Sequence, residues 1–226
     1  MKRKILGLTS LFSLFLLCSP GTGRAQEAPR RMIPAVSAFI SADYFAPKFG
    51  DVDAAYAAIE KNYFLPAGND FRSYYSVMGG VRFSPVQQQS LQAELGVSLY
   101  KSKLGNSIRQ TGSINFMQLY YLGGTYLVNF PVQRVSFFIG AGPGYMWLNT
   151  QRTYNVEPGV ARVGAGLLQL HGTGGVEYYH PTGVSFGLEG GYYYASTPFP
   201  ERADLDFTLK GFTVGIKVTV PIVNGL

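Results

Sequence analysis

Apolar and polar residues alternate with a period of two along most of the chain from Ala35 onward. The clearest stretch runs from Phe212 to Ile222, where apolar residues at even positions alternate with Thr213, Gly215, Lys217 and Thr219. This alternation predicts β-strands with two chemically different faces. The predicted strands are 35–45, 71–84, 90–101, 113–130, 135–149, 161–179, 184–196 and 207–222. Most exceed the usual strand length of about 5–6 residues and suit membrane-spanning strands of about 9–11.

The connections between these segments alternate in length. Short ones lie at 84–89, 131–134 and 180–183, and each contains a proline, which suits a turn. Long ones lie at 46–70, 102–112, 150–160 and 197–206. Short turns at one end and long loops at the other are typical of an up-and-down outer-membrane barrel, with turns in the periplasm and loops outside.

The two faces of the strands differ in size, which predicts the side that meets lipid. One face is bulky and apolar, whereas the opposite face carries mostly small or polar residues. The bulky set includes Tyr75, Val77, Val81, Phe83, Leu91, Leu95, Leu99, Tyr120, Leu122 and Phe130, and the small set includes Ser76, Gly80, Gln92, Gly96, Gly123, Thr125, Gly187 and Gly215. An eight-stranded barrel has an interior just wide enough for side chains to fill, so the bulky set belongs outside. A lipocalin-like barrel, apolar inside, is the alternative that this size argument disfavours. The positions of the aromatic residues support a membrane barrel, because these residues fall near both predicted rims, where such barrels carry aromatic girdles.

Composition supports a chain that does not face water on all sides. Only 14% of the 226 residues are charged, whereas globular domains carry about 25%. A single cysteine excludes a disulfide framework or a cysteine-built zinc site, and two histidines leave little for a metal centre. We therefore predict no metal and no cofactor.

The first 25 residues have the features of a cleaved signal peptide. Basic residues at 2–4 precede an apolar run at 5–18, and Ala25 precedes the best cleavage point. Cys18 raises the alternative of a lipoprotein, which Leu17 before it disfavours. Residues 26–34 are predicted to be a periplasmic tether. Without residues 1–25 the chain keeps 15 of its 19 basic residues against 13 acids, so its basic character gives no reason to expect a nucleic-acid partner.

Three glycine- and aromatic-rich stretches carry a family resemblance: 79–83, 137–145 and 187–192. They resemble strands of the small outer-membrane β-barrel domains of the OmpA, OmpX and OmpW types. This resemblance implies an all-β, eight-stranded antiparallel transmembrane barrel over 35–226 in the Gram-negative outer membrane. Its implied partners are outer-membrane lipid, lipopolysaccharide and the barrel-assembly machinery. Pro143 departs from the pattern and predicts a bulge, and the terminal Leu226 replaces the usual aromatic residue.

Five charged residues fall on the predicted inner face: Arg82, Glu94, Glu177, Glu189 and Lys217. Counting around the turn at Pro85 makes Arg82 and Glu94 diagonal neighbours on adjacent strands. Buried charges are costly unless paired, so we expect an ion-paired plug across the lower lumen. A loosely hydrated polar interior is the alternative.

Other candidate chemistry is weak in the sequence. His171 faces inward with no serine evident beside it, which argues against a lipid-modifying enzyme. Asp51 and Asp53 are better explained as capping a short helix, 52–62, in the first long loop than as a calcium site. The leading interpretation is therefore a non-catalytic barrel with a structural or surface-interaction role. The OmpW-type resemblance implies an alternative, a porin-like narrow passage for small hydrophobic molecules, with Phe39, Tyr74 and Tyr193 in the upper lumen.

Overall fold

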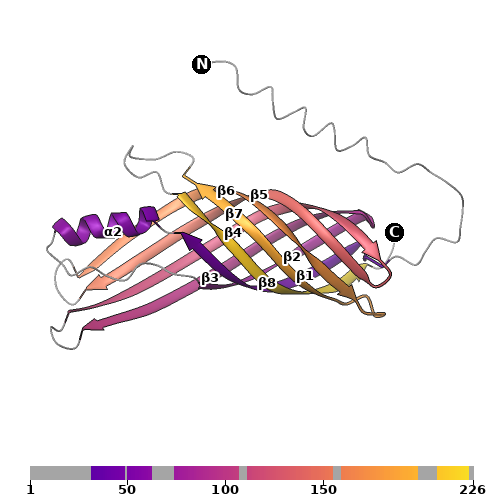
Figure 1. The fold of residues 1–226 in the computed structure, drawn as a ribbon, viewed down its shortest axis with the longest axis horizontal. Coiled ribbons are helices and arrows are strands. Elements are labelled where there is room, and N and C mark those ends of the chain that lie inside the picture. The colour runs from indigo at the N-terminus through magenta and orange to yellow at the C-terminus, as the bar shows by residue number, and fades with distance from the viewer. Residues whose placement is uncertain are drawn as a thin grey trace, which may run out of the picture. The chain divides into compact units, whose positions relative to one another are not determined.

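The computed structural model describes residues 32–48, 50–62, 74–106, 111–154, 159–197 and 208–223. The predicted signal peptide, the first residues of the predicted tether, Tyr63 and Leu226 lie outside these ranges. The elements in chain order are β1 (Val36–Lys48), α2 (Gly50–Asn62), β2 (Tyr74–Val86), β3 (Gln89–Asn106), β4 (Thr111–Val132), β5 (Val135–Tyr154), β6 (Val160–Tyr179), β7 (Ser185–Ser196) and β8 (Thr208–Val223). All eight predicted strands and the predicted helix are present, displaced at their ends by a few residues (Figure 1).

Each strand pairs antiparallel with its neighbours in the chain, and β1 closes the barrel against β8. The pairing is staggered around the circumference. Paired residues followed from Val36 through all eight strands return to β1 at Ala46, ten positions further along. A stagger of this kind tilts the strands and sets the width of the lumen. It also brings residues of distant strands to the same height inside the barrel.

The alternation predicted from the sequence places large apolar side chains on the outside. Leu170 and Phe212, on the outer face of the sheet, are 64% and 68% exposed. Arg82, on the inner face, is 1% exposed. The side chains on the outer face of the sheet are therefore apolar and those in the lower lumen are polar, the reverse of a water-soluble barrel. No helix among the described residues is long and apolar enough to cross a membrane.

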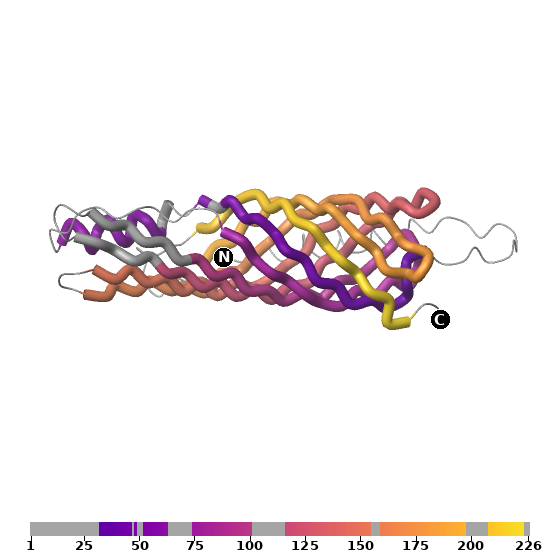
Figure 2. The backbone as a smooth tube through the Cα atoms, turned by 90° about the horizontal axis from the view of Figure 1, so that it is seen from below, coloured from indigo at the N-terminus to yellow at the C-terminus, as the bar shows by residue number. Residues whose placement is uncertain are grey.

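The wall of the barrel is uneven in height. Strands β3 to β6 contain between 18 and 22 residues, whereas β1, β2, β7 and β8 contain between 12 and 16. The additional length lies at the end with the long loops, where the helix α2 lies beside the projecting ends of β5 and β6 (Figures 1 and 2). The two chain ends of the barrel lie at the opposite, short-turn end.

The bulge predicted at Pro143 is not present. Pairing of β4 with β5 lapses between Gly144 and Ala141 and then resumes in the same register, so no residue is inserted. Pro143 is exposed on the outer face and pairs with Leu170 of β6. The lapse falls at Pro143, whose missing N–H interrupts the ladder without requiring an inserted residue. A Cβ atom at neighbouring Gly142 would overlap the backbone carbonyl of Gly124 on β4. The strands approach closely at a glycine instead of bulging at the proline.

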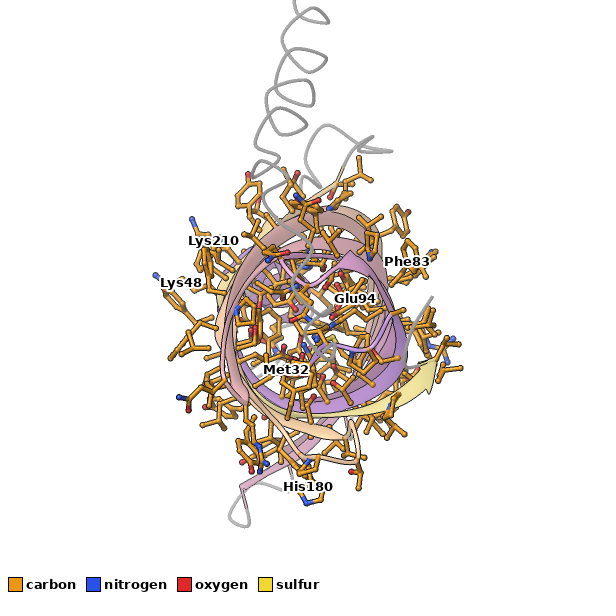
Figure 3. The ribbon with its side chains drawn as sticks, turned by 90° about the vertical axis from the view of Figure 1, so that its right-hand side faces the viewer. Met32, Lys48, Phe83, Glu94, His180 and Lys210 are labelled. Carbon is orange, nitrogen blue, oxygen red and sulfur yellow. The ribbon has the colours of Figure 1, made fainter. Side chains whose placement is uncertain are left out.

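The chain before β1 packs into the short-turn end of the barrel. Ile33 and Ala35 are fully buried, and the Ser84 backbone N–H donates to the Ala35 carbonyl at 2.8 Å. Figure 3, drawn from this end, places Met32 within the outline of the barrel. The segment just before β1 therefore helps to close the lower mouth.

Candidate functional site

A buried ion pair crosses the lower lumen from β2 to β6. Two guanidinium nitrogens of Arg82 donate to the two carboxylate oxygens of Glu177, each at 2.7 Å. Tyr179 donates to the same carboxylate at 2.5 Å, and Gln92 accepts from Arg82 at 3.3 Å. Because β2 and β6 lie on opposite sides of an eight-stranded barrel, this bidentate contact spans the lumen.

The ion-pair partner of Arg82 is not Glu94, the neighbour predicted from the turn between β2 and β3. Arg82 lies opposite Gln92 in the β2–β3 register, so Glu94 is its diagonal neighbour, as counted. Its guanidinium nevertheless binds Glu177, which lies 95 positions further along the chain. Counting around one turn locates only the adjacent strand, whereas the stagger of the closed barrel brings β6 to the height of Arg82.

Glu94 belongs to a second polar group one layer higher, which Gln92 connects to the Arg82 pair. Its carboxylate accepts from the Thr125 hydroxyl, from Tyr121 at 3.2 Å and from Gln92 at 3.1 Å. The His171 Nε2 lies 3.3 Å from the same carboxylate and 2.7 Å from the Thr125 Oγ1. Figure 3 shows Glu94 inside the ring of strands. The sequence pattern predicted none of these contacts of Glu94, because it related Glu94 only to Arg82.

The other two predicted charges, Lys217 and Glu189, lie on β8 and β7. Lys217 and Glu189 form a direct ion pair, and the Lys217 ammonium also lies 5.2 Å from the ring centres of Phe39 and Phe138. Nearby on β1, Asp43 is buried and accepts a hydrogen bond from Ser41 at 2.9 Å. The five predicted charges thus all face the lumen in three groups, and Gln92 joins the Arg82 group to the Glu94 group by hydrogen bonds to both residues.

Above these charges the lumen becomes apolar. The buried cluster there contains Phe45, Val52, Tyr56, Tyr74, Met117, Leu119, Tyr121, Met146, Leu148, Tyr154, Ala161, Leu167, Tyr193, Ala195 and Leu209. It encloses a cavity of about 30 Å³, and a second cavity of about 10 Å³ lies among Glu94, His171 and Glu189. The sequence indicated Tyr74 and Tyr193 but missed the inward residues of β4, where both faces are bulky and the size contrast between faces disappears. We call this cluster the upper chamber.

The helix α2 covers the upper chamber at the long-loop end. The Tyr56 hydroxyl lies 3.0 Å from the Thr150 Oγ1, and Glu60 accepts from Arg152 at 2.5 Å and from Tyr154 at 3.0 Å. The Arg152 guanidinium lies 4.5 Å from the centre of the Tyr56 ring. Burial raises the pKa of the Tyr56 hydroxyl above the ordinary tyrosine value. The predicted helix is therefore packed against the inner side of the tall wall.

The histidines do not form an accessible catalytic site among the described residues. His171 has a hydroxyl and a carboxylate within reach, the residue types that nucleophilic catalysis uses. However, the Thr125 hydroxyl contacts Glu94 as well as the imidazole, and all three residues are at most 5% exposed. His180 lies exposed in the turn after β6, beside Thr182. Within the described ranges no group of three or more His, Cys, Asp or Glu residues could hold a metal ion.

Several solved protein structures have a fold similar to that of this chain. Neisserial surface protein A matches with a TM-score of 0.52 at 12% identity, over 84% of this chain and 98% of that one. Ail of Yersinia pestis matches with a TM-score of 0.45 at 11% identity, over 82% and 97% of the two chains. The N-terminal barrel domain of Pseudomonas aeruginosa OprF matches with a TM-score of 0.41 at 9% identity, over 80% and 97%. No protein-family model and no curated protein sequence matches the chain.

Proposed function

On the premise that the chain folds as a small eight-stranded outer-membrane β-barrel, we propose that it is a closed, non-catalytic membrane anchor. Its role is to hold the tall wall and α2 at the outer surface, where they are available for surface interactions. The observation that carries this proposal is the bidentate pair of Arg82 and Glu177 across the lower lumen. Export by residues 1–25, insertion by the barrel-assembly machinery and residence in a Gram-negative outer membrane are parts of the same proposal.

The ion pair supports a closed lumen because Arg82 and Glu177 neutralise each other. Neither charge is then available to attract an ion into the lumen. Both side chains are at most 2% exposed, and their hydrogen bonds are satisfied by each other, Gln92 and Tyr179. Removing one partner from a buried pair is strongly unfavourable, so the pair stays formed. The packed segment at Ile33 adds an apolar obstruction near the lower mouth.

Single-channel recording in planar bilayers tests this proposal. The purified unmodified chain is expected to give very low conductance. The double variant Arg82→Ala/Glu177→Ala, which removes the crossing pair without leaving a lone buried charge, is expected to conduct more. A steady, large conductance from the unmodified protein would overturn closure by the ion pair.

A narrow passage for small hydrophobic molecules is a second candidate, favoured by the upper chamber. Its cavity of about 30 Å³ is lined mainly by apolar and aromatic side chains, together with a few polar ones: Phe45, Tyr74, Met78, Val97, Leu119, Tyr121, Met146 and Tyr193, and Asp43, Ser76, Ser98 and Thr213. Such a passage needs a larger opening, because this space holds little more than a water molecule or two. Uptake of an alkane or a steroid by cells with and without the protein separates the candidates. Reduced uptake without the protein favours transport, and unchanged uptake favours the anchor.

The lipid-modifying alternative depends on His171. The contacts of Thr125 with both Glu94 and His171 tie up the nearest hydroxyl, which disfavours its use as a nucleophile. Lipid A acyl-chain composition, compared with and without the protein, tests this point. A gained or lost acyl chain would show that the barrel is an enzyme.

A further inference from the structure

Two lysines lie side by side on the outer surface where the barrel closes. Lys48 of β1 is directly opposite Lys210 of β8 in the strand register, and both side chains are exposed. Figure 3 shows both projecting from the same side of the barrel. Tyr194 of β7 lies opposite Lys210 and is 47% exposed, so three neighbouring strands present a row of one aromatic and two basic side chains.

This row lies at the outer edge of the apolar band. On β8 the outward residues below Lys210 are Phe212, Val214 and Ile216, each at least 60% exposed. On β1 the exposed Tyr44 and Ala46 lie below Lys48. Both lysines belong to the strand ends nearer the long loops, which is the outer side of the membrane. They therefore lie where acyl chains give way to the headgroups of the outer leaflet.

The charges of the row are not balanced by the described part of the chain. Among the described outward positions of β7, β8 and β1 there is no aspartate or glutamate, since Asp43 and Glu189 face the lumen. No described residue forms an ion pair with Lys48 or Lys210. Like charges directly opposite each other on neighbouring strands are unfavourable. An anion held between the two ammonium groups removes this repulsion.

We propose that Lys48, Lys210 and Tyr194 bind a phosphate group of lipid A in the lipopolysaccharide of the outer leaflet. Two lysines can each donate to one phosphate, which accepts through several oxygens. The Tyr194 ring suits the boundary between acyl chains and sugar, because it has an apolar body and a polar tip. The apolar residues below the row offer a surface for the acyl chains. The site rests on the outer face, so it does not depend on whether the lumen is closed.

Lipid retention by the folded chain in detergent, measured by native mass spectrometry, tests this site. The probes are bisphosphorylated lipid A, lipid A with both phosphates removed, and phosphatidylglycerol. We expect the unmodified protein to retain bisphosphorylated lipid A most strongly. Lys48→Gln/Lys210→Gln should weaken that retention by about thirtyfold at low salt, from the attraction of two lysines to an anionic surface. Retention of phosphate-free lipid A should not change.

Two control variants separate charge from packing and position. Lys48→Arg/Lys210→Arg keeps both charges and should retain bisphosphorylated lipid A. Arg134→Gln removes an exposed charge from the β4–β5 turn at the other rim and should have no effect. Equal melting temperatures in detergent establish that the variants are folded.

Three results would overturn the assignment. Unchanged retention by the glutamine variant would mean that the two lysines do not hold the phosphate. Equal losses for phosphorylated and phosphate-free lipid A would assign the contact to apolar packing. Equal retention of phosphatidylglycerol would show a general anionic surface without selectivity for lipid A.

Discussion

The lower lumen and the upper chamber are built in opposite ways within one barrel. The lower lumen is filled by charged and hydrogen-bonding side chains around Arg82 and Glu177, whereas the upper chamber is filled by aromatic and aliphatic ones such as Leu167 and Tyr193. The lower region is held by directional contacts between fixed partners. The upper region is held by close packing, which tolerates rearrangement better when volume is conserved. Fixed polar partners therefore suit the lower half to the closure proposed above, whereas the apolar packing of the upper half and α2 is the part more tolerant of change.

Breaking the lower ion pair should have the largest effect. Arg82→Leu leaves Glu177 buried without its cation, and we expect the free energy of unfolding to fall by about 4 kcal/mol. Denaturant unfolding of the reconstituted protein measures this loss. The double variant Arg82→Met/Glu177→Leu serves as the control, because replacing both charges by apolar groups should recover most of the stability. If the double variant is as unstable as the single one, the stability of the lower lumen depends on side-chain volume and not on charge.

Truncating the upper chamber should cost less. Leu167 is fully buried, so Leu167→Ala removes methyl groups and leaves a cavity that the rigid wall cannot close. We expect a loss of about 3 kcal/mol in the same unfolding measurement. Leu170→Ala on the outer face of the same strand is the matched control, and lipid chains can fill the space that it leaves. Equal losses at the two positions would contradict a tightly packed chamber.

Weakening the contact between α2 and the barrel should have a local effect. Glu60→Gln removes the charge that Arg152 binds, and we expect α2 to lose about 1–2 kcal/mol of docking free energy while the barrel stays folded. Hydrogen exchange of the α2 amides should quicken, with little change in the midpoint of global unfolding. Lys61→Gln, on the exposed side of the same helix, should leave exchange unchanged. A matching drop in global stability would show that α2 is an integral part of the barrel core.

The smallest effect should come from pH. Because burial raises the pKa of Tyr56 above the ordinary value of about 10, docked α2 binds that proton more tightly than undocked α2. The docking free energy should therefore be constant below pH 10 and decline as the pH rises beyond it. Hydrogen exchange of α2 relative to the barrel strands across this range measures the decline. Tyr56→Phe should weaken the dependence and leave the contribution of Tyr154, whose hydroxyl contacts α2 through Glu60. An unaltered dependence would assign it to other groups.

More of the fold than of the candidate site could be predicted from the sequence. Strand number, order and facing follow from the alternation of residues such as Phe212 and Thr213, because a strand has only two faces and side-chain size assigns each of them. The inward direction of Arg82 and Glu177 could be predicted for the same reason. The Pro143 bulge was predicted wrongly, because the β4–β5 pairing only lapses at the proline and resumes in the same register, with no residue inserted.

Wherever the two faces of a strand differ in size, the sequence by itself determined which residues face the lipid and which face the lumen, because that choice depends only on local alternation and size. In the upper part of β4, where both faces are bulky, the structure was needed. Tertiary structure alone decided which luminal groups meet. The contact of Arg82 with Glu177, and of Glu94 with His171, joins strands far apart in the chain. Their common height results from the ten-residue stagger between Val36 and Ala46, which exists only once β1 has closed on β8.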